Sequence, residues 1–326
     1  MNYNEDDFIK VATGIDSEFD RLLKKTWDEA KQFDVFRYNV DEGSILSRII
    51  PGKFGFVAQF NKQRGSLRRK PQSSSALKMP FQPDLFNFTK AKPEEVLFTL
   101  KIDGASTETS ILINNSPIEY CSSLMVPDLR SCLPQVFTTD ALFQAICLIA
   151  LSAQKSLRMG FNSLGAAASV NHLHMHLYYF DFDLEIENFE TSGDSFLEDW
   201  PIKGIMFVIE ELNIKKFKEV ADCVSRLVEK CYQMNIAHNL FLTRNRCGNA
   251  IKVILWPRKP EFGSKNDMDL AAAMCEFSGF FICKTEECYT TLSEEMCIDL
   301  IKSVDVVSGN VKVEFSQILD SQSFGN

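Results

Sequence analysis

Apolar residues at helical spacing predict long helices in three parts of the chain. In residues 17–32, Phe19, Leu22, Leu23 and Trp27 recur at intervals of three and four, which places them on one helical face. Residues 139–156 form a second such segment, with Thr139 predicted as its N-cap, and residues 215–234 form a third. These three helices are the longest elements that the pattern predicts.

Short runs rich in β-branched and aromatic residues predict strands. They lie at residues 54–60, 96–102, 110–113, 124–126, 170–180, 205–209, 239–243 and 251–256. The sequence of a long helix, a short turn and strands that follows residue 139 recurs after residue 215. This recurrence indicates a degenerate internal duplication. The acidic residues 181–200 between the copies predict an irregular excursion at the surface.

Three of the four histidines lie within the predicted strand 170–180. Since side chains alternate along a strand, His172, His174 and His176 would share one face, and Leu173 would point with its apolar neighbours toward a core. Such a row indicates a reaction centre or, less often, a metal site. Alternate residues of a strand are rooted roughly 6–7 Å apart, so three rings reach one ion only if the strand bends.

A turn rich in small residues precedes the histidines, at 162–169. Small side chains and free backbone N–H groups let a phosphate approach the main chain closely. Asn162, Gly165 and Ser169 are therefore candidate ligands of a nucleotide phosphate. A phosphate-binding turn next to a histidine row favours nucleotidyl transfer.

Composition and charge limit the partners of the chain. Its 326 residues carry a formal net charge of −9, which argues against a general affinity for nucleic acid or acidic membranes. Ten scattered cysteines without a Cys-x-x-Cys pair are typical of a reduced, cytoplasmic protein. The longest apolar run, 141–153, is too short to span a bilayer.

One basic segment stands out in this acidic chain. Residues 62–70 contain five cations, including Lys62 and Arg64. Such runs are most often solvated loops, and the alternative is a flap that brings positive charge to the phosphates of a substrate.

Several motifs together resemble a known superfamily. Asn162, Gly165 and Ser169, followed by His172, His174 and His176, resemble the histidine-triad signature. Further stretches at 50–59, 86–90, 94–98, 161–165, 238–240 and 276–279 resemble one of its branches, the GDP-hexose phosphorylases, which are related to galactose-1-phosphate uridylyltransferases. The resemblance implies an α+β fold with antiparallel sheets, flanking helices and two pseudo-repeated halves. Residues 1–45 would be an N-terminal helical segment, 46–200 the catalytic half, and 201–326 a degenerate second half packed on the first.

The resemblance also implies an activity without a cofactor. The partners would be a GDP-hexose and inorganic phosphate, and the reaction would be phosphorolysis of GDP-D-glucose to GDP and glucose 1-phosphate. His174 would attack the α-phosphorus and carry the guanylyl group, His172 would orient it, and His176 would bind phosphoryl oxygens. A homodimer fits the same family. The alternatives are a histidine-triad nucleotide hydrolase and a non-catalytic protein that binds guanine nucleotides.

Two further residues are candidates and two positions depart from the family. A histidine on a predicted strand, such as His238, is most often a packed core residue. The resemblance adds a nucleotide-binding role as the alternative. Glu276, in an apolar stretch, would accept hydrogen bonds from sugar hydroxyls or pair with a cation. The relatives usually have glutamine where this chain has His176, and Gly-His where it has Cys121-Ser122. Because that histidine helps to bind a structural metal in uridylyltransferases, we predict no metal here.

Overall fold

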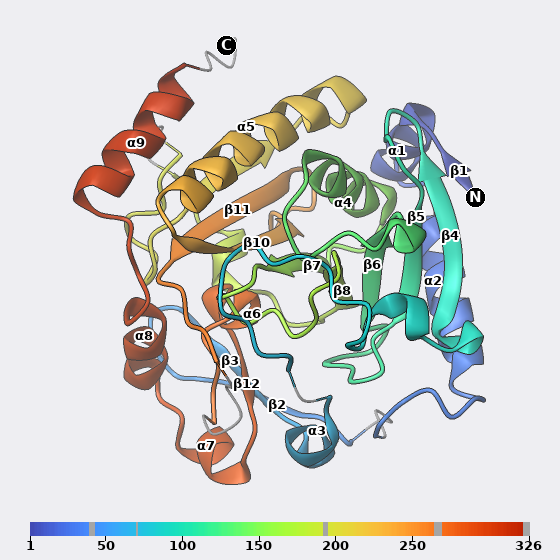
Figure 1. Cartoon of the computed structure of the whole chain (residues 1–326), viewed down its shortest axis with the longest axis horizontal. Coiled ribbons are helices and arrows are strands. Elements are labelled where there is room, and N and C mark those ends of the chain that lie inside the picture. Colours follow the sequence, from blue (N-terminus) through green and yellow to red (C-terminus); the bar gives the residue numbers. More distant parts are fainter. Residues whose placement is uncertain (39–42, 70, 192–194, 264–268, 322–326) are drawn as a thin grey trace.

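A large, mostly antiparallel sheet forms the centre of the computed structural model, which describes residues 1–38, 43–69, 71–191, 195–263 and 269–321 (Figure 1). Within these residues the sheet has nine strands, and only β1 and β4 pair in parallel. From one edge to the other the strands are β1 (Asn2–Tyr3), β4 (Val96–Ile102), β5 (Thr109–Ile113), β6 (Ser123–Pro127), β8 (Met175–Tyr179), β7 (Leu157–Asn162), β10 (Ala237–Arg244), β11 (Ile251–Arg258) and β9 (Ile205–Ile209). The predicted α+β class with antiparallel strands is confirmed.

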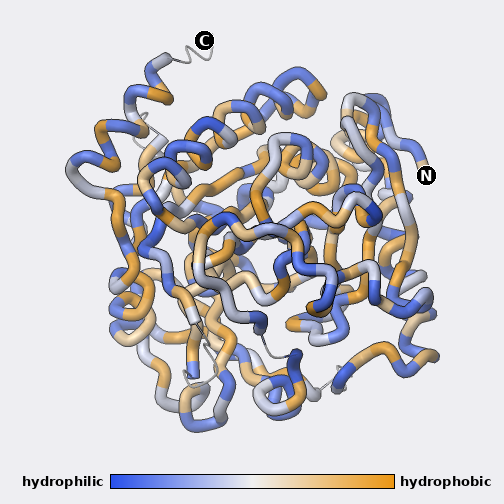
Figure 2. Tube along the Cα trace, viewed as in Figure 1, coloured by the Kyte–Doolittle hydropathy of each residue, from blue (hydrophilic) through white to orange (hydrophobic). Residues whose placement is uncertain are grey.

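Helices cover one face of this sheet. They are α1 (Glu5–Ala12), α2 (Glu18–Ala30), α4 (Thr139–Leu151), α5 (Ile214–Gln233) and α9 (Gly309–Asp320), and α4 lies beside α5 in Figure 1. Figure 2 shows apolar segments concentrated in the strands, whereas α5 alternates between polar and apolar residues along its length. That alternation is typical of a helix with one face on a core and the other in water.

A smaller sheet and short helices cover part of the opposite face. The sheet has the order β12 (Phe280–Cys283), β3 (Val57–Phe60) and β2 (Leu46–Ile49). The helices are α3 (Lys62–Leu67), α6 (Met274–Phe277), α7 (Glu286–Thr291) and α8 (Glu294–Lys302), and single 3-10 turns lie at Phe88–Lys90, Pro93–Glu95, Leu129–Ser131 and Glu185–Glu187. A second apolar core fills the space between the two sheets.

The strand order reflects the predicted duplication. Strands β7 and β10 are antiparallel neighbours within the sheet, β8 and β11 flank them, and α4 and α5 precede them in the chain. The order helix, strand, strand therefore occurs twice. The boundaries of the two halves at residue 200 stay a prediction.

Several predicted boundaries were wrong. Helix α4 is capped by Thr138, whose side chain accepts from Ala141 N, and it ends at Leu151 because Ser152 is extended. The histidine strand begins only at Met175, since the preceding backbone bonds to the segment 133–135 instead of a neighbouring strand: Leu173 N donates to Leu133 O, and His174 N donates to Gln135 Oε1. Lys62–Leu67 is a short helix rather than a loop, capped by Asn61.

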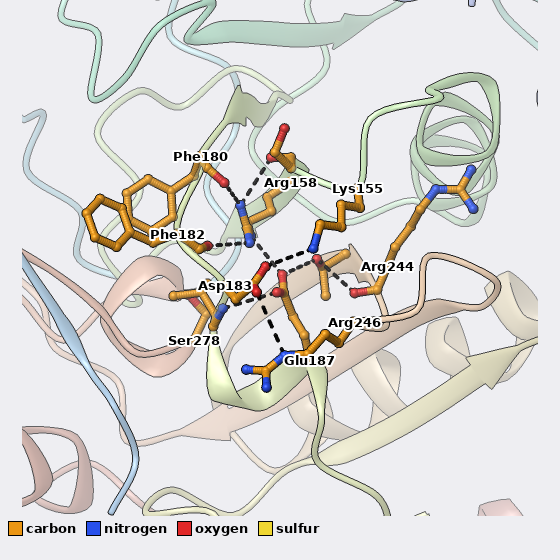
Figure 3. Close-up of polar contacts among 12 residues, drawn as sticks. Lys155, Arg158, Phe180, Phe182, Asp183, Glu187, Arg244, Arg246 and Ser278 are labelled. Carbon is orange, nitrogen blue, oxygen red and sulfur yellow. Dashed lines mark hydrogen bonds and ion pairs between the residues drawn. The ribbon is translucent and has the colours of Figure 1, made fainter. Parts of the chain in front are cut away.

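The segment 181–200 is also more buried than expected from its acidity. Among its described residues, Leu184, Ile186, Leu197 and Trp200 belong to the second core. Figure 3 shows why the acidic residues tolerate this position: the guanidinium of Arg158 on β7 contacts Glu187 and the carbonyl oxygens of Phe180 and Phe182.

Helix α4 accounts for the long apolar run of the sequence. It packs against α1, α5 and the sheet, and residues 141–151 are all buried. Within the described ranges, no helix has both the length and the apolarity required to cross a membrane.

Candidate active site

His176 lies in a row of residues that crosses the sheet on the face away from α4. It pairs with Leu124 on one side and Gly160 on the other, and Leu124 in turn pairs with Leu112, which pairs with Val96. Paired residues of neighbouring strands point to the same face. The row is therefore a floor that is apolar on one side of His176.

A cavity lies above this floor and brings together most of the predicted site. Its lining includes Asn162, Gly165, Ser169, His174, His176, Arg64 and Glu276. His172, Lys62 and His238 do not line it. Lys62 is exposed on α3, so the two cations proposed for phosphate binding have different surroundings.

One ring nitrogen of His174 forms a hydrogen bond, and among the described residues the other has no hydrogen-bond partner. Its Nδ1 lies 2.7 Å from the carbonyl oxygen of His172. A carbonyl oxygen only accepts, so Nδ1 carries the proton and Nε2 keeps its lone pair. Burial lowers the pKa of His174 to about 4, and the ring is therefore neutral at pH 7. A neutral imidazole with a free lone pair is a nucleophile.

The backbone of His174 is held by Gln135, a residue that the sequence did not indicate. Gln135 Oε1 accepts from His174 N at 2.9 Å, and its Nε2 donates to the carbonyls of Asn162 and His174. Its own backbone N–H donates to Asn171 Oδ1. Gln135 lies far from the motif in sequence and has no recognisable spacing to it. Only the fold reveals this contact.

The other two histidines of the triad differ from His174. His172 is fully buried; its Nδ1 accepts from Phe88 N, and burial lowers its pKa to about 4. It contacts residues of the cavity lining through its carbonyl, which accepts from His174 Nδ1, and through its ring, which packs on Phe88. His176 is half-buried, and burial, followed by the charges of His174 and Arg64, lowers its pKa to about 3.

The rival interpretation of the histidine row was a metal site. Among the described residues, no group of three or more histidine, cysteine or carboxylate side chains is arranged to bind a metal ion. The Nδ1 atoms of His172 and His174 both bond to the backbone instead.

Arginines of the basic segment lie beside the histidines. Arg64 Nη1 donates to the carbonyl of Ser116 and to the Tyr38 hydroxyl, at 2.9 Å from the latter. Arg68 also lines the cavity, and burial and then the charge of Arg64 lower its pKa. Lys70, the last cation of the segment, lies outside the described residues. The structure thus places the two guanidinium groups and the neutral rings of His174 and His176 in the lining of one cavity.

Some hydrogen-bonding groups of the turn at 162–169 are already used in contacts within the protein. Asn162 Oδ1 accepts from Asn239 Nδ2 and from Met274 N, and the amides of Ala166 and Ala168 donate to Ser163 O. Gly165 has a φ of +73°, and a Cβ there would lie 2.9 Å from Phe262 Cε1. Side chains are thus excluded at Gly165 by both conformation and space.

Glu276 faces the cavity as a buried carboxyl group. It lies on α6, where Oε2 accepts from Ala273 N and Oε1 accepts from Ile282 N. Burial raises its pKa to about 7, although these hydrogen bonds and the positive charge of Arg64 act in the opposite direction. One acceptor lone pair on each oxygen remains for a ligand hydroxyl.

The Cys121-Ser122 departure is accommodated without loss of the local fold. Cys121 is buried with a φ of +56°, the left-handed region that favours glycine, which is the residue in the resembled motif. Ser122 O accepts from Trp27 Nε1 and from Asn114 N. The substitution therefore strains one residue while the turn keeps its hydrogen bonds.

His238 lies in the core rather than in the cavity. Its ring stacks on Phe161 with centroids 5.7 Å apart and meets the edges of Phe137 and Tyr232. In the described part of the chain, neither ring nitrogen has a hydrogen-bond partner. Burial lowers its pKa to about 3.

We expect His238→Phe to stabilise the protein more at pH 5 than at pH 8. The unfolded histidine binds a proton as the pH falls below its ordinary pKa of 6.5, but the folded one, with a pKa of about 3, does not. Stability from this group is present above pH 6.5 and is lost as the pH falls, by about 2 kcal/mol at pH 5. Urea unfolding of both proteins at the two pH values measures it.

Tyr232→Phe is the matched control, since it alters the same ring cluster without a group that titrates between pH 5 and 8. An equal stability difference between wild type and His238→Phe at both pH values would contradict the prediction.

Comparisons with known proteins show the family of this chain. The family model described as "GDPGP1-like, N-terminal domain" matches residues 18–178, and "GDPGP1-like, C-terminal domain" matches residues 194–316. The chain is 37% identical to GDP-D-glucose phosphorylase 1 of Danio rerio over 93% of this chain and 92% of that protein. It is 36% identical to the Homo sapiens protein of that name, over 88% and 79%.

A plant relative and a solved structure extend the comparison. GDP-L-galactose phosphorylase 2 of Arabidopsis thaliana is 30% identical over 94% of this chain and 77% of that protein. The crystal structure of yeast Ap4A phosphorylase Apa2 in complex with Ap4A superposes with a TM-score of 0.63 at 14% identity, over 89% of this chain and 98% of that one. At this identity the likeness shows a shared fold.

Proposed function

This chain belongs to the GDPGP1-like family, and we propose that it catalyses the phosphorolysis of GDP-D-glucose to GDP and glucose 1-phosphate. The observation that carries this proposal is the free Nε2 of a neutral His174, held in a cavity that also contains His176 and Arg64. The identity to GDP-hexose phosphorylases over most of the chain supports the substrate class.

In the first step His174 Nε2 attacks the α-phosphorus of GDP-D-glucose. A nitrogen–phosphorus bond forms, and the bond from that phosphorus to the bridging oxygen breaks, so glucose 1-phosphate leaves with the electron pair. The guanylylated ring becomes cationic. It keeps its proton on Nδ1, and this N–H continues to donate a hydrogen bond to the carbonyl oxygen of His172. In the second step an oxygen of inorganic phosphate attacks the same phosphorus, and GDP leaves the regenerated His174.

The remaining groups stabilise charge on the phosphates. Neutral His176 donates an N–H to a phosphoryl oxygen, and Arg64 and Arg68 supply positive charge in a site sheltered from water, where it acts strongly. Gln135 keeps the His174 backbone in place between the two steps. Asn162, Gly165 and Ser169 form the adjacent wall of the phosphate site.

The floor of the cavity sets the direction of the substrate. The apolar side, Leu112 and Leu124, suits a flat nucleobase, and the opposite side carries Glu276, whose oxygens suit sugar hydroxyls. The α-phosphorus then lies over His176, between them.

The test is a panel of nucleotide sugars assayed with and without inorganic phosphate. We expect glucose 1-phosphate and GDP to form in equal amounts from GDP-D-glucose, and only when phosphate is present. Release of GMP at a rate that does not depend on phosphate would instead identify a nucleotide hydrolase. Binding of GDP without any turnover would identify a non-catalytic guanine-nucleotide-binding protein.

We propose two further properties together with this function, a cytoplasmic location and a homodimer. A cytoplasmic location fits the ten cysteines, none of which forms a disulfide in the described structure. A homodimer is expected from the family resemblance alone, and the molecular mass in solution tests it.

A further inference from the structure

One side of the cavity, here called the apolar slot, is lined by apolar residues. Its floor is Leu112 and Leu124, and Phe88 and Val170 pack on the same residues in a small apolar cluster separate from the two main cores. All four line the cavity. A cluster that leaves part of its surface open to a cavity is typical of a site for a flat apolar ligand.

Two charged residues lie beside this slot, because Glu95 precedes Val96 and Arg69 stacks on Phe86, and Val96 and Phe86 both pack against the apolar cluster. Glu95 closes the 3-10 turn Pro93–Glu95, and Arg69 follows α3; both line the cavity. The guanidinium of Arg69 lies over the ring of Phe86, with Cζ 3.2 Å from the centroid, which fixes the plane of its N–H groups. Burial and then the charge of Arg37 lower the pKa of Arg69, and the nearby negative charge of Glu95 acts in the opposite direction.

Each of the two charged groups keeps unused hydrogen-bonding capacity. Glu95 Oε1 accepts from Lys92 N at 3.1 Å, and no donor among the described residues bonds to Oε2. The side-chain N–H groups of Arg69 have no recorded acceptor in the same part of the chain, although its backbone N–H donates to Ser116 Oγ. An anion and a cation beside an apolar slot can therefore form hydrogen bonds with the edge of a base bound in that slot.

The purine bases present different edges to such a pair. Guanine has two neighbouring donors, N1–H and the 2-amino group, next to the acceptor O6. Adenine has an acceptor at N1 and a donor at its 6-amino group, so a carboxylate facing N1 would meet a lone pair. Hypoxanthine keeps N1–H and O6 but lacks the 2-amino group. A carboxylate that accepts two hydrogen bonds prefers guanine.

We propose that Glu95 and Arg69 select guanine, with the Glu95 carboxylate accepting from N1–H and the 2-amino group while Arg69 donates to O6. This inference rests on the proposed function, because it assigns the base end of the same substrate. It separates base recognition from the phosphate chemistry at His174 and places the two at opposite ends of the apolar floor.

The experiment compares the binding of GDP and IDP by calorimetry, and kcat/KM for the glucose esters of both nucleotides. Wild type should bind GDP about tenfold or more tightly than IDP, which lacks one donor to the carboxylate. Glu95→Gln removes the charge but keeps the acceptor for Lys92 N. It should weaken GDP binding by about 10- to 100-fold and reduce the GDP-to-IDP ratio by about fivefold or more.

The matched control is Glu94→Gln, which removes a charge from the neighbouring, exposed residue of the same turn, outside the cavity lining. It should leave the GDP-to-IDP ratio at the wild-type value. An unchanged ratio in Glu95→Gln, or a wild type that does not prefer GDP, would overturn the inference. Tight, guanine-selective binding that depends on Glu95 but is accompanied by no turnover would support it and contradict the proposed function alone.

Discussion

Replacing His174 by alanine is expected to reduce the rate of glucose 1-phosphate release by about 10⁴-fold or more. The variant lacks the Nε2 lone pair that would bond to the α-phosphorus, and we assign the neutral ring of His176 to the phosphoryl oxygens rather than to attack on phosphorus. Because the His174 side chain bonds only to a backbone carbonyl, its loss leaves the hydrogen bonds of Gln135 to the main chain intact. We therefore expect a folded protein that still binds GDP.

The direct measurement is the covalent adduct. GDP-D-glucose labelled in the guanine is incubated with the enzyme without phosphate, and the label that stays on the denatured protein is counted. Wild type should retain an acid-labile, base-stable label that added phosphate discharges as GDP, and His174→Ala should retain none.

His176→Gln is the matched variant, because the resembled families usually carry glutamine there. An amide still donates a hydrogen bond to a phosphoryl oxygen, so we expect a labelled protein and a rate reduced by no more than about 100-fold. A label that persists in His174→Ala, or that moves to His176, would show that another residue is the nucleophile.

Replacing Glu187 by glutamine is expected to lower the free energy of unfolding by about 3–5 kcal/mol. Arg158 and Glu187 are 1% and 4% exposed, and Arg158 Nε donates to Glu187 Oε1 at 2.8 Å (Figure 3). Thr243 and the backbone of Leu184 also donate to this carboxylate. Without the negative charge of Glu187, the guanidinium of Arg158 remains buried with only carbonyl oxygens as partners. Urea unfolding at pH 7 measures the effect.

An exposed ion pair gives the comparison. Glu198 bonds to Lys312 at the surface, and Glu198→Gln should change the free energy of unfolding by no more than about 1 kcal/mol. A loss below 1 kcal/mol in Glu187→Gln would contradict the prediction. The double variant Arg158→Met/Glu187→Leu should be more stable than Glu187→Gln, because it leaves neither charge buried alone.

The sequence allowed the elements near the site to be predicted more closely than the contacts within it. The strand at Val96–Ile102 was predicted at its observed boundaries, and α2 (Glu18–Ala30) begins one residue after the predicted start at residue 17 and ends two residues before the predicted end at residue 32. These elements bury one regular stripe, so local pattern carries the information. The histidine tract failed as a full strand because Leu173 N and His174 N bond to the segment 133–135, a partner that no local pattern reveals.

The candidate site shows the same division. The residues Asn162, Gly165, Ser169, His174 and His176 follow from one motif, and the structure places them around one cavity. His238 has a motif of equal prominence, yet it lies in a ring cluster of the core. Its environment depends on the rings of Phe137 and Phe161, which are distant in sequence.

By itself, the sequence determined the alternation of helices and strands, the family, and the residue types available for phosphorus chemistry, because these depend on local order. The tertiary structure alone decided which histidine has its Nδ1 bonded to a backbone carbonyl while its ring lines the cavity, and which cations and carboxyl groups line that cavity. Those properties depend on burial and on hydrogen bonds between segments such as 133–135 and 172–174. A chain creates such surroundings only when it folds.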